Sequence, residues 1–251
     1  MKEKKSKIVV IFLAYNASKT LEKFYLEFPK KFVSDIILVD DASKDNTFKI
    51  AKKLGIKSFR NPVNLGYGGN MKRALNLALA SGANIVIDIH PDGEYKPSAI
   101  PYAIKKIESG AEFVLGNRFT NFYNPLTSGM YIWKWLPIRL LNFLDTIILG
   151  INLDDFHQGF RVYTKKMLER INYQSNSNNY LFSFELIAQA VYHKVKISQV
   201  PVETSYTGKK RGASLINSIK YSMGTFKVLL LFMMAKLGFR IQLFQSKQLS
   251  V

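Results

Sequence analysis

Short apolar runs alternate with helix-like segments through the first half of the chain. The first run, Ile8–Leu13, consists of β-branched and aliphatic residues plus one phenylalanine, which is typical of a strand buried on both faces of a parallel sheet. Similar runs lie at Ile36–Val39, Ile85–Ile87 and Phe113–Leu115, and helices are expected at 18–28, 45–54 and 98–108. This alternation predicts an α/β fold with a mainly parallel central sheet flanked by helices.

Polar clusters follow directly after three of these predicted strands. They begin at Asp40, His90 and Asn117. Ligands of parallel sheets bind beyond the carboxyl ends of the strands, so we expect the three clusters to converge on one crevice.

The pattern is less regular in the second half. Met130–Leu149 is aromatic and aliphatic, and Pro137 is expected to kink or begin a helix there. Leu181–Val191 predicts a buried helix and Val195–Val200 a short strand. We expect residues 1–214 to form the catalytic domain and residues 215–251 a helical tail, loose from Gln242 onward.

The tail from Leu215 onward mixes apolar residues with regularly placed lysines. This pattern fits an amphipathic helix on an acidic membrane surface, and it fits equally an ordinary helix packed on the core. Its most apolar part, Val228–Ala235, is far shorter than the roughly 20 residues that span a bilayer. A transmembrane helix is therefore not expected.

Composition narrows the function classes. The chain has 251 residues, 47% of them hydrophobic, with 36 Lys and Arg against 18 Asp and Glu, so its formal charge of +18 favours anionic partners. Basic residues are scattered and no zinc-finger spacing occurs, so no nucleic acid partner is expected. The absence of cysteine excludes disulfides and thiolate sites, and the N-terminus lacks a long apolar signal segment, which favours a cytoplasmic location.

Asp40 and Asp41 stand at the end of a predicted strand. Carboxylates in this position accept hydrogen bonds from a base or ribose in dinucleotide folds. Nearby, Ser43 and Asp45 have a second explanation, because either side chain could cap the following helix.

Residues 64–70 form a glycine-rich turn before a helix, and Lys72 and Arg73 follow it. The amides and cations of such a turn suit phosphate, although these turns are common. The Gly-Lys-Ser/Thr ending of a P-loop and the strand spacing of a dinucleotide fold are both missing, which disfavours ATPases and dehydrogenases.

His90, Asp92 and Glu94 offer an imidazole and two carboxylates in a tight turn. This set could hold a hard divalent cation that bridges two phosphates, Mg²⁺ or Mn²⁺. The alternative is a solvated turn in which His90 merely packs at a strand end.

A dense polar cluster lies between apolar segments at residues 153–161. A carboxylate in it could deprotonate an acceptor, and its arginine could orient the acceptor or bind phosphate. A charged surface loop with an Asp–Arg ion pair is the alternative.

The order and spacing of these clusters resemble family 2 glycosyltransferases of GT-A fold, particularly the branch of dolichol-phosphate mannose synthases and polyprenyl-phosphate glycosyltransferases. The resemblance covers most of residues 8–214. Its motifs are the AYN loop at 14–16, DDxSxDxT at 40–47, NxGxGG at 64–69, GNRF at 116–119, DxxxGFR at 155–161, Glu185, and the PV and RxGxS segments at 201–202 and 211–214.

The resemblance implies roles for individual residues. Asp41 would contact the base and Asp40 the ribose or its surroundings. The implied donor-binding set is Ala14, Tyr15, Asn16, Asp40, Asp41, Asn64, Gly66, Gly69, Lys72, Arg118, Arg211 and Ser214. Asp155 takes the place of the catalytic base, with His157 and Arg161 near the acceptor and phosphates.

Two positions depart from the family pattern. In the family, a proline lies five residues after the second aspartate of the DxD metal motif. Asp92 and Pro97 have this spacing, so Asp92 takes the second position of the motif and His90 the first. Histidine can bind a divalent metal or hydrogen-bond phosphate, but it is neutral and softer than carboxylate, so this motif implies Mg²⁺ or Mn²⁺ less directly than a complete DxD motif does. Ala17 stands where the family often has glutamate.

The resemblance implies an inverting transfer of a sugar from a nucleotide-diphosphate donor to a lipid-phosphate or glycan acceptor, with peripheral contact to the cytoplasmic membrane face. Two alternatives stay open. A nucleotidyltransferase on a similar sheet would release pyrophosphate from a nucleoside triphosphate. A non-catalytic nucleotide-sugar-binding protein would bind the donor without turnover.

Overall fold

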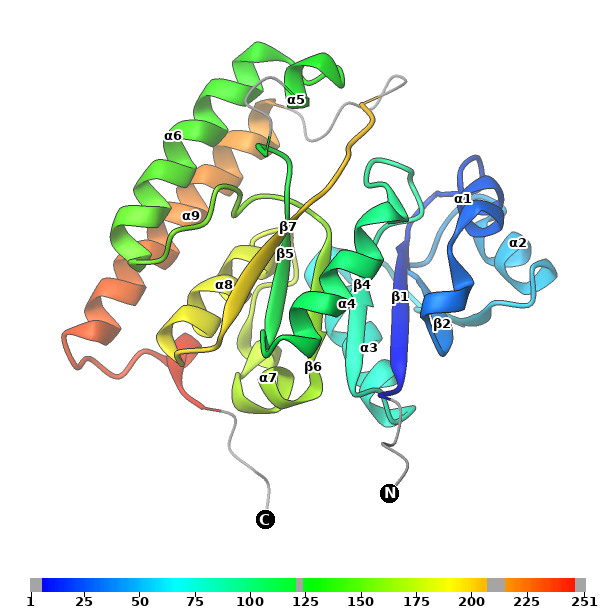
Figure 1. Ribbon diagram of the computed structural model, residues 1–251, viewed down its shortest axis with the longest axis horizontal. Coiled ribbons are helices and arrows are strands. Elements are labelled where there is room, and N and C mark those ends of the chain that lie inside the picture. The colour runs from blue at the N-terminus through cyan, green and yellow to red at the C-terminus, as the bar shows by residue number, and fades with distance from the viewer. Residues whose placement is uncertain (1–5, 121–123, 207–214, 247–251) are drawn as a thin grey trace.

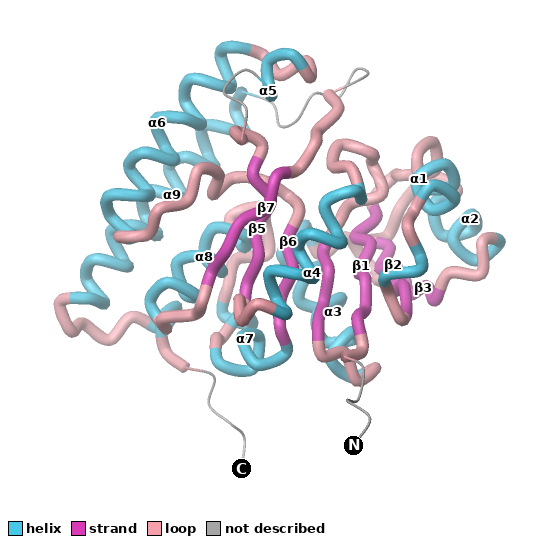
Figure 2. The backbone as a smooth tube through the Cα atoms, viewed as in Figure 1, coloured by secondary structure: helices cyan, strands magenta, loops and turns pink. Residues whose placement is uncertain are grey.

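The computed structural model describes residues 6–120, 124–206 and 215–246. In these ranges seven strands form one sheet in the order β3-β2-β1-β4-β6-β5-β7. The strands are β1 (Ile8–Ala14), β2 (Asp35–Asp40), β3 (Lys57–Arg60), β4 (Ile85–Asp88), β5 (Phe113–Asn117), β6 (Arg161–Thr164) and β7 (Ile197–Pro201). Figure 2 shows them side by side across the middle of the molecule.

Six strands of the sheet run parallel, and β6 is antiparallel to both of its neighbours, β4 and β5. The predicted α/β fold with a mainly parallel sheet is confirmed. Four predicted strands are one or two residues longer in the structure, whereas the strand expected at Val195–Val200 begins later, at Ile197, and ends at Pro201. The sequence pattern did not indicate β3 or β6, because their sequences, KSFR and RVYT, have charged or polar residues at both ends and lack a continuous apolar run.

Helices cover both faces of the sheet. The longer helices are α1 (Leu21–Glu27), α2 (Thr47–Lys53), α3 (Gly66–Ala80), α4 (Ile100–Glu108), α6 (Ile132–Leu149), α7 (Lys165–Arg170), α8 (Phe182–Tyr192) and α9 (Leu215–Lys236). Short turns of helix are η1 (Lys30–Phe32), η2 (Pro97–Ala99), α5 (Asn124–Thr127), η3 (Tyr173–Ser175) and η4 (Gln242–Phe244).

Alternation along β1 divides the core into two halves. Val9, Ile11 and Leu13 face the half that contains α3, α7, α8 and α9, whereas Val10 and Phe12 face the half that contains α1, α2 and α4. Both sets are buried, which explains why the strand reads as one continuous apolar run. In Figure 1, α4 lies in front of the sheet and α3 and α8 lie behind it.

The C-terminal segment packs on the core of the sheet domain. Helix α9 buries Val228, Leu229 and Phe232 against the core and lies beside α8 and α6. After α9, Phe244 in η4 is buried against Tyr192, so the expectation of a loose end from Gln242 is wrong for residues 242–246. An aromatic anchor outweighs the polar composition of this short stretch.

Pro137 lies inside α6, in its second turn, and the helix begins earlier, at Ile132. The expected helix start at this proline is therefore wrong. Helix α1 likewise begins at Leu21 with no side-chain cap, and Ser18 does not cap it. Instead, the Ser18 amide donates to Asp45 Oδ2 at 3.1 Å.

Candidate functional site

The carboxyl ends of β1, β2, β4 and β5 meet at one edge of the sheet, because these strands are parallel. Ala14, Asp40, Asp88 and Asn117 are the last residues of these strands. The loops that carry the predicted polar clusters leave from this edge. The convergence that the sequence predicted is confirmed at the level of the sheet.

Two loops at this edge are hydrogen-bonded to each other. Asn16 N donates to Ser43 Oγ at 2.8 Å, and Ala17 N donates to Thr47 Oγ1 at 2.7 Å. Lys44 N in turn donates to Asn16 Oδ1 at 2.9 Å. Asn16 adopts the left-handed region with φ 53°, which asparagine tolerates better than most residues. The hydroxyls of the DDxSxDxT segment thus position the opening loop.

Ser43 therefore has an inter-loop role, and it does not cap α2. Asp45 serves both ends of its loop: Oδ1 accepts from Thr47 N at 2.9 Å at the start of α2, and Oδ2 accepts from Ser18 N. The hydrogen bonds from Thr47 and Ser18 outweigh partial burial and lower the pKa of Asp45 to about 2.

Asp40 and Asp41 are both buried but hold different segments. Asp41 Oδ1 accepts from Asn61 Nδ2 at 2.7 Å and from Leu65 N at 2.8 Å. Asp40 Oδ2 lies 3.2 Å from Arg60 Nε, and Asp40 is fully buried. Asp41 thus positions the segment before α3, whereas a ribose contact by Asp40 stays a prediction.

The glycine-rich segment is the first turn of α3 and packs tightly on a neighbouring backbone. Gly68 N and Gly69 N donate to Asn178 O at 2.8 and 3.3 Å. A Cβ at Gly68 would lie 2.1 Å from Ser177 O, which requires glycine there. Lys72 Nζ donates to Asn178 Oδ1 at 2.9 Å. These groups would have to change partners to bind phosphate, so the phosphate role of Gly66, Gly69 and Lys72 stays a prediction.

A buried carboxylate that the sequence analysis did not single out lies at the end of β4. Asp88 is fully buried, and the antiparallel register places it directly opposite Arg161 of β6. His90 Nε2 lies 3.6 Å from Asp88 Oδ1. Among the described residues, the Asp88 oxygens and His90 Nε2 have no hydrogen-bond partner of good geometry.

Burial raises the pKa of Asp88 to about 6, although the positive charges of His90 and Arg161 act in the opposite direction. Arg161 is also buried, and its Nε has no hydrogen-bond partner within the described ranges. Unpaired buried polar groups are costly, so this cluster is a candidate for ligand or water contact.

Asp92 lies in the exposed turn after His90. Its Oδ1 accepts from Glu94 N at 2.9 Å, as the alternative interpretation of a solvated turn requires. Within the part of the chain that the structure describes, no three His, Asp or Glu side chains are grouped closely enough to hold a metal by themselves. A cation here would need ligands from the substrate as well.

Arg118 and Asp155 form a buried two-point ion pair. Arg118 Nε donates to Asp155 Oδ2 at 2.7 Å and Nη2 donates to Oδ1 at 2.9 Å. Arg118 Nη1 donates to Tyr206 OH at 3.1 Å, and its Nη2 also donates to the carbonyl of His157 at 2.8 Å. Both oxygens of the expected base are therefore engaged within the protein, and both side chains are at most 5% exposed.

His157 connects the polar loop to two helices. Its Nδ1 lies 3.0 Å from Tyr221 OH of α9, and its Nε2 lies 2.8 Å from Asp145 Oδ2 of α6. Burial raises the pKa of Asp145 above its ordinary value, although the contact with His157 acts in the opposite direction. The loop that resembles the acceptor segment is thus joined to the inner sides of α6 and α9.

The sequence pattern did not indicate Asp88 or Asp145 as candidate functional residues. Asp88 ends an otherwise apolar run, and Asp145 lies within the apolar segment 130–149, so neither stood out locally. A weak signal existed, because Asp88 and His90 are two residues apart and such residues share a face on a strand. Two predicted donor residues, Arg211 and Ser214, lie outside the described residues.

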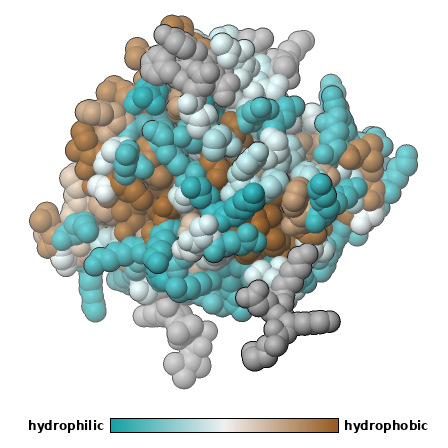
Figure 3. All heavy atoms as spheres, in the orientation of Figure 1, coloured by the Kyte–Doolittle hydropathy of each residue, from teal (hydrophilic) through white to brown (hydrophobic). Residues whose placement is uncertain are grey.

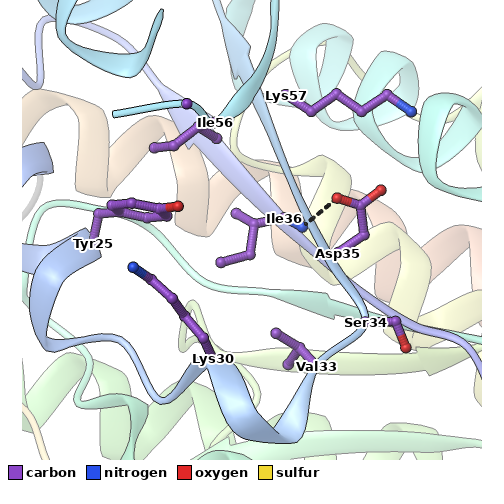
Figure 4. Close-up of a pocket in the computed structure, with 9 residues that line it drawn as sticks. Tyr25, Lys30, Val33, Ser34, Asp35, Ile36, Ile56 and Lys57 are labelled. Atoms are coloured by element: carbon purple, nitrogen blue, oxygen red, sulfur yellow. Dashed lines mark hydrogen bonds between the residues drawn. The ribbon is translucent and has the colours of Figure 1, made fainter. Parts of the chain in front are cut away.

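One open hollow in the described part of the structure lies away from these residues. It measures about 340 Å³. Its lining residues are Tyr25, Lys30, Val33, Ser34, Asp35, Ile36, Gly55, Ile56 and Lys57. Figure 4 shows these side chains around the starts of β2 and β3, the opposite end of the sheet from the candidate site.

Comparisons with known proteins agree with the fold and the motif order. The glycosyl transferase family 2 model matches residues 9–171. A UDP-N-acetylglucosamine–dolichyl-phosphate N-acetylglucosaminyltransferase from Methanococcus voltae is 29% identical over 255 residues, covering 92% of this chain and 96% of that protein. A polyprenol monophosphomannose synthase from Mycolicibacterium smegmatis is 23% identical over 203 residues, covering 77% and 74%.

Solved structures show the same architecture. Glucosyl-3-phosphoglycerate synthase from Mycobacterium tuberculosis, in complex with Mn²⁺, UDP and glucosyl-3-phosphoglycerate, superposes with a TM-score of 0.68 at 16% identity. The match covers 95% of this chain and 82% of that one. At this identity the likeness establishes the fold.

The sheet order and the likeness to this solved structure define a GT-A type fold. The chain belongs to glycosyl transferase family 2, whose model matches well over half of it, and it is a glycosyltransferase. No helix within the described ranges has the length and apolarity needed to cross a membrane.

Proposed function

We propose that this glycosyltransferase moves a sugar from a nucleoside diphosphate sugar to a polyprenyl phosphate at a membrane surface. The observation that carries the acceptor part is the exposed apolar face of α6 and α9, two helices whose inner sides contact His157. The relatives named for dolichyl phosphate and polyprenol support the same acceptor class.

The apolar face consists of residues that recur every three or four positions on both helices. Its members on α6 are Ile132, Leu136, Leu140, Phe143 and Ile147, and on α9 they are Ile216, Ile219, Met223, Phe226, Leu230 and Met233, with Leu237 directly after α9. Each of these side chains is at least 42% exposed. Figure 3 shows hydrophobic residues gathered along the side of the molecule where Figure 1 places α6 and α9. A contiguous apolar face of this size marks an interaction surface.

Charge on these helices favours an anionic lipid surface. Lys220, Lys227 and Lys236 lie on α9, which contains no acidic residue. The one acidic residue of α6, Asp145, is buried against His157. Basic amphipathic helices of this kind lie in the plane of an anionic membrane.

The donor is proposed to bind at the ends of β1 and β2. The predicted nucleoside position is surrounded by Ala14, Tyr15, Asn16, Asp40, Asp41 and Asn64. Hydrogen bonds between the loops of these residues fix the loops relative to each other. Asp41 is the best candidate for a base contact, because its carboxylate is held by Asn61 and Leu65. Arg211 and Ser214 complete the proposed donor set.

His90 and Asp92 fit a divalent cation, Mg²⁺ or Mn²⁺, that is shared with the donor diphosphate. The fit rests on the exposed position of Asp92 and on the unpartnered polar atoms at His90 and Asp88. Such cations are commonly held by one or two protein groups plus substrate phosphates. When bound, the cation stabilises the charge that develops on the departing diphosphate.

A polyprenyl phosphate needs no deprotonation near neutral pH, so its oxygen can attack the sugar C1 directly, with inversion. Asp155 then acts by holding Arg118 in place, and the pair orients the phosphate together with Arg161 and His157. Positioning of two reactants supplies much of the rate in such transfers. This role agrees with the full engagement of both Asp155 oxygens.

The test is transfer of radiolabelled sugar from a panel of UDP- and GDP-sugars to polyprenyl phosphate and, in parallel, to the matching polyprenol. We expect transfer to the phosphate, stimulation by Mn²⁺ or Mg²⁺, and little transfer to the alcohol. Transfer to neither acceptor from any donor would overturn the proposal. Release of pyrophosphate from a nucleoside triphosphate, or donor binding without turnover, would favour the nucleotidyltransferase or the non-catalytic binder.

A further inference from the structure

The resemblance to the family places His90 at the first aspartate of the metal motif, and a buried carboxylate, Asp88, lies close to its ring. Asp88 belongs to the same strand end, two residues earlier, and its Oδ1 lies 3.6 Å from His90 Nε2. Asp88 is fully buried, whereas the His90 side chain is 21% exposed. The imidazole therefore separates a buried charge from the crevice.

The buried carboxylate lacks the hydrogen bonds that usually accompany such a group. Burial raises the pKa of Asp88, and an interaction with the buried Tyr163 side chain acts in the opposite direction. However, neither Asp88 oxygen has a hydrogen-bond partner of good geometry within the described ranges, and the same holds for His90 Nε2. Arg161, opposite Asp88 in the register, supplies a compensating positive charge. A buried carboxylate and a ring nitrogen that face each other without a hydrogen bond lower the stability of the fold, so a purely structural role does not explain them.

We propose that Asp88 is a positioning residue that orients His90 toward the donor-bound divalent cation and supplies the negative charge that histidine lacks. With Nε2–H turned to Asp88, Nδ1 is left as the unprotonated nitrogen that can act as a ligand. Histidine ligands in metal sites commonly donate their second N–H to a carboxylate, which sets the tautomer and strengthens the ligand. The inference rests on the proposed function, because it requires a cation at the donor site.

The ring of His90 has little freedom to turn away from this orientation. Tyr67 packs against it with ring centroids 5.5 Å apart, and Tyr67 OH accepts from Ser183 Oγ at 3.0 Å. Tyr180 in turn stacks on the Tyr67 ring, with ring centroids 5.1 Å apart. A packed ring needs only a small shift to bring Nε2 within hydrogen-bond distance of Asp88, about 3.2 Å.

The first test is a double-mutant cycle on cation binding. Mn²⁺ affinity in the presence of saturating UDP, or GDP if that nucleotide binds, is read from the loss of the free Mn²⁺ electron paramagnetic resonance signal. We expect Asp88→Asn to weaken Mn²⁺ binding 10- to 100-fold, as loss of a carboxylate behind a ligating histidine does. In a His90→Asp background the same change should alter affinity less than about threefold, because the imidazole it acts through is gone.

Asp35→Asn is the matched control, because Asp35 lies at the opposite end of the sheet and accepts only a local bond from Ile36 N. It should leave Mn²⁺ affinity unchanged. Equal loss of Mn²⁺ affinity in both backgrounds, or no loss with Asp88→Asn, would overturn the inference. The proposed function would still stand in that case, provided that the parent protein binds nucleotide and Mn²⁺. Absence of Mn²⁺-dependent nucleotide binding in the parent would instead overturn the cation part of the proposed function.

A second measurement avoids substitution, in case Asp88→Asn does not fold. The chain has only three histidines, so ¹⁵N-histidine labelling gives a tractable nuclear magnetic resonance spectrum. We expect the Nε2–H tautomer at His90, and we expect Mg²⁺ with nucleoside diphosphate to shift its Nδ1 signal without shifting those of His193. The Nδ1–H tautomer, or a His90 signal indifferent to Mg²⁺, would overturn the inference.

Discussion

Arg118 holds Asp155 by two hydrogen bonds of 2.7 and 2.9 Å, and both side chains are buried. The pair joins the end of β5 to the loop before β6, positions 37 residues apart in the sequence. Because both charges are buried, removal of either one would leave the other without its partner. The pair therefore fixes the end of β5 against this loop.

Asp155→Asn should lower the free energy of unfolding by about 3–5 kcal/mol, because it leaves the Arg118 guanidinium buried without its partner. Urea unfolding monitored by circular dichroism measures this loss, and sugar transfer to polyprenyl phosphate should fall with it. Adding Arg118→Gln should recover part of the stability. Unchanged stability with lost transfer would instead identify Asp155 as a base.

Asp41→Asn should weaken nucleoside diphosphate binding about tenfold, equivalent to about 1.4 kcal/mol. The substitution keeps an oxygen for Asn61 and Leu65 but removes the charge that would accept a hydrogen bond from the base. Isothermal titration calorimetry with UDP and GDP measures the effect. Asp35→Asn, the same change at the other end of β2, serves as the control, and equal weakening by both would contradict a base contact.

Met223→Asp and Leu230→Asp should each reduce sedimentation of the protein with phosphatidylglycerol vesicles. Both side chains lie on the exposed apolar face of α9, where a carboxylate would remain close to anionic lipid. Leu26→Asp is the matched control, since Leu26 is equally exposed on α1. Binding to phosphatidylcholine vesicles should be weaker from the outset, and equal binding to both lipids would argue against the charge contribution.

Glu112→Gln should destabilise the protein by about 2 kcal/mol near pH 7. Glu112 contacts Lys166 Nζ at 2.9 Å and Arg170 Nη2 at 3.0 Å, and its Oε2 accepts from Lys196 N at 3.2 Å. Despite partial burial, which acts in the opposite direction, these contacts lower the pKa of Glu112 below its ordinary value of 4.5.

The stabilisation by Glu112 is therefore fully present above pH 4.5 and is lost as the pH falls through the lower pKa of the folded state. Urea unfolding of the parent and the variant at pH 7 and at pH 3.5 measures the difference. A difference that does not shrink at the lower pH would show that the charge of Glu112 is not responsible.

Gly68→Ala should lower the melting temperature, even though alanine favours helix formation over glycine. The added Cβ would lie 2.1 Å from Ser177 O, so the 177–178 backbone has to move and the hydrogen bond to Gly68 N is lost or stretched. We expect a loss of about 1–3 kcal/mol, as in other overpacked sites. An unchanged melting temperature would show that this segment yields without cost.

The amino-acid sequence by itself determined the architecture of the N-terminal half, in which strands and helices alternate. Continuous apolar runs such as Ile8–Leu13 indicate strands buried on both faces, and the polar residues after them lie at the carboxyl edge of the sheet. Local composition is enough to identify these strands, because a strand that is buried on both faces is apolar at consecutive positions. The family motifs, in their order, likewise require no structure to read.

Tertiary structure alone decided how the charged groups are paired. The antiparallel strand β6 lacks a continuous apolar run, yet its register sets Arg161 opposite Asp88. Gly68 meets Asn178, and His157 meets Asp145 and Tyr221, only because distant helices pack together. Such partners are chosen by register and packing over long sequence distances, and no local pattern of residues records that choice.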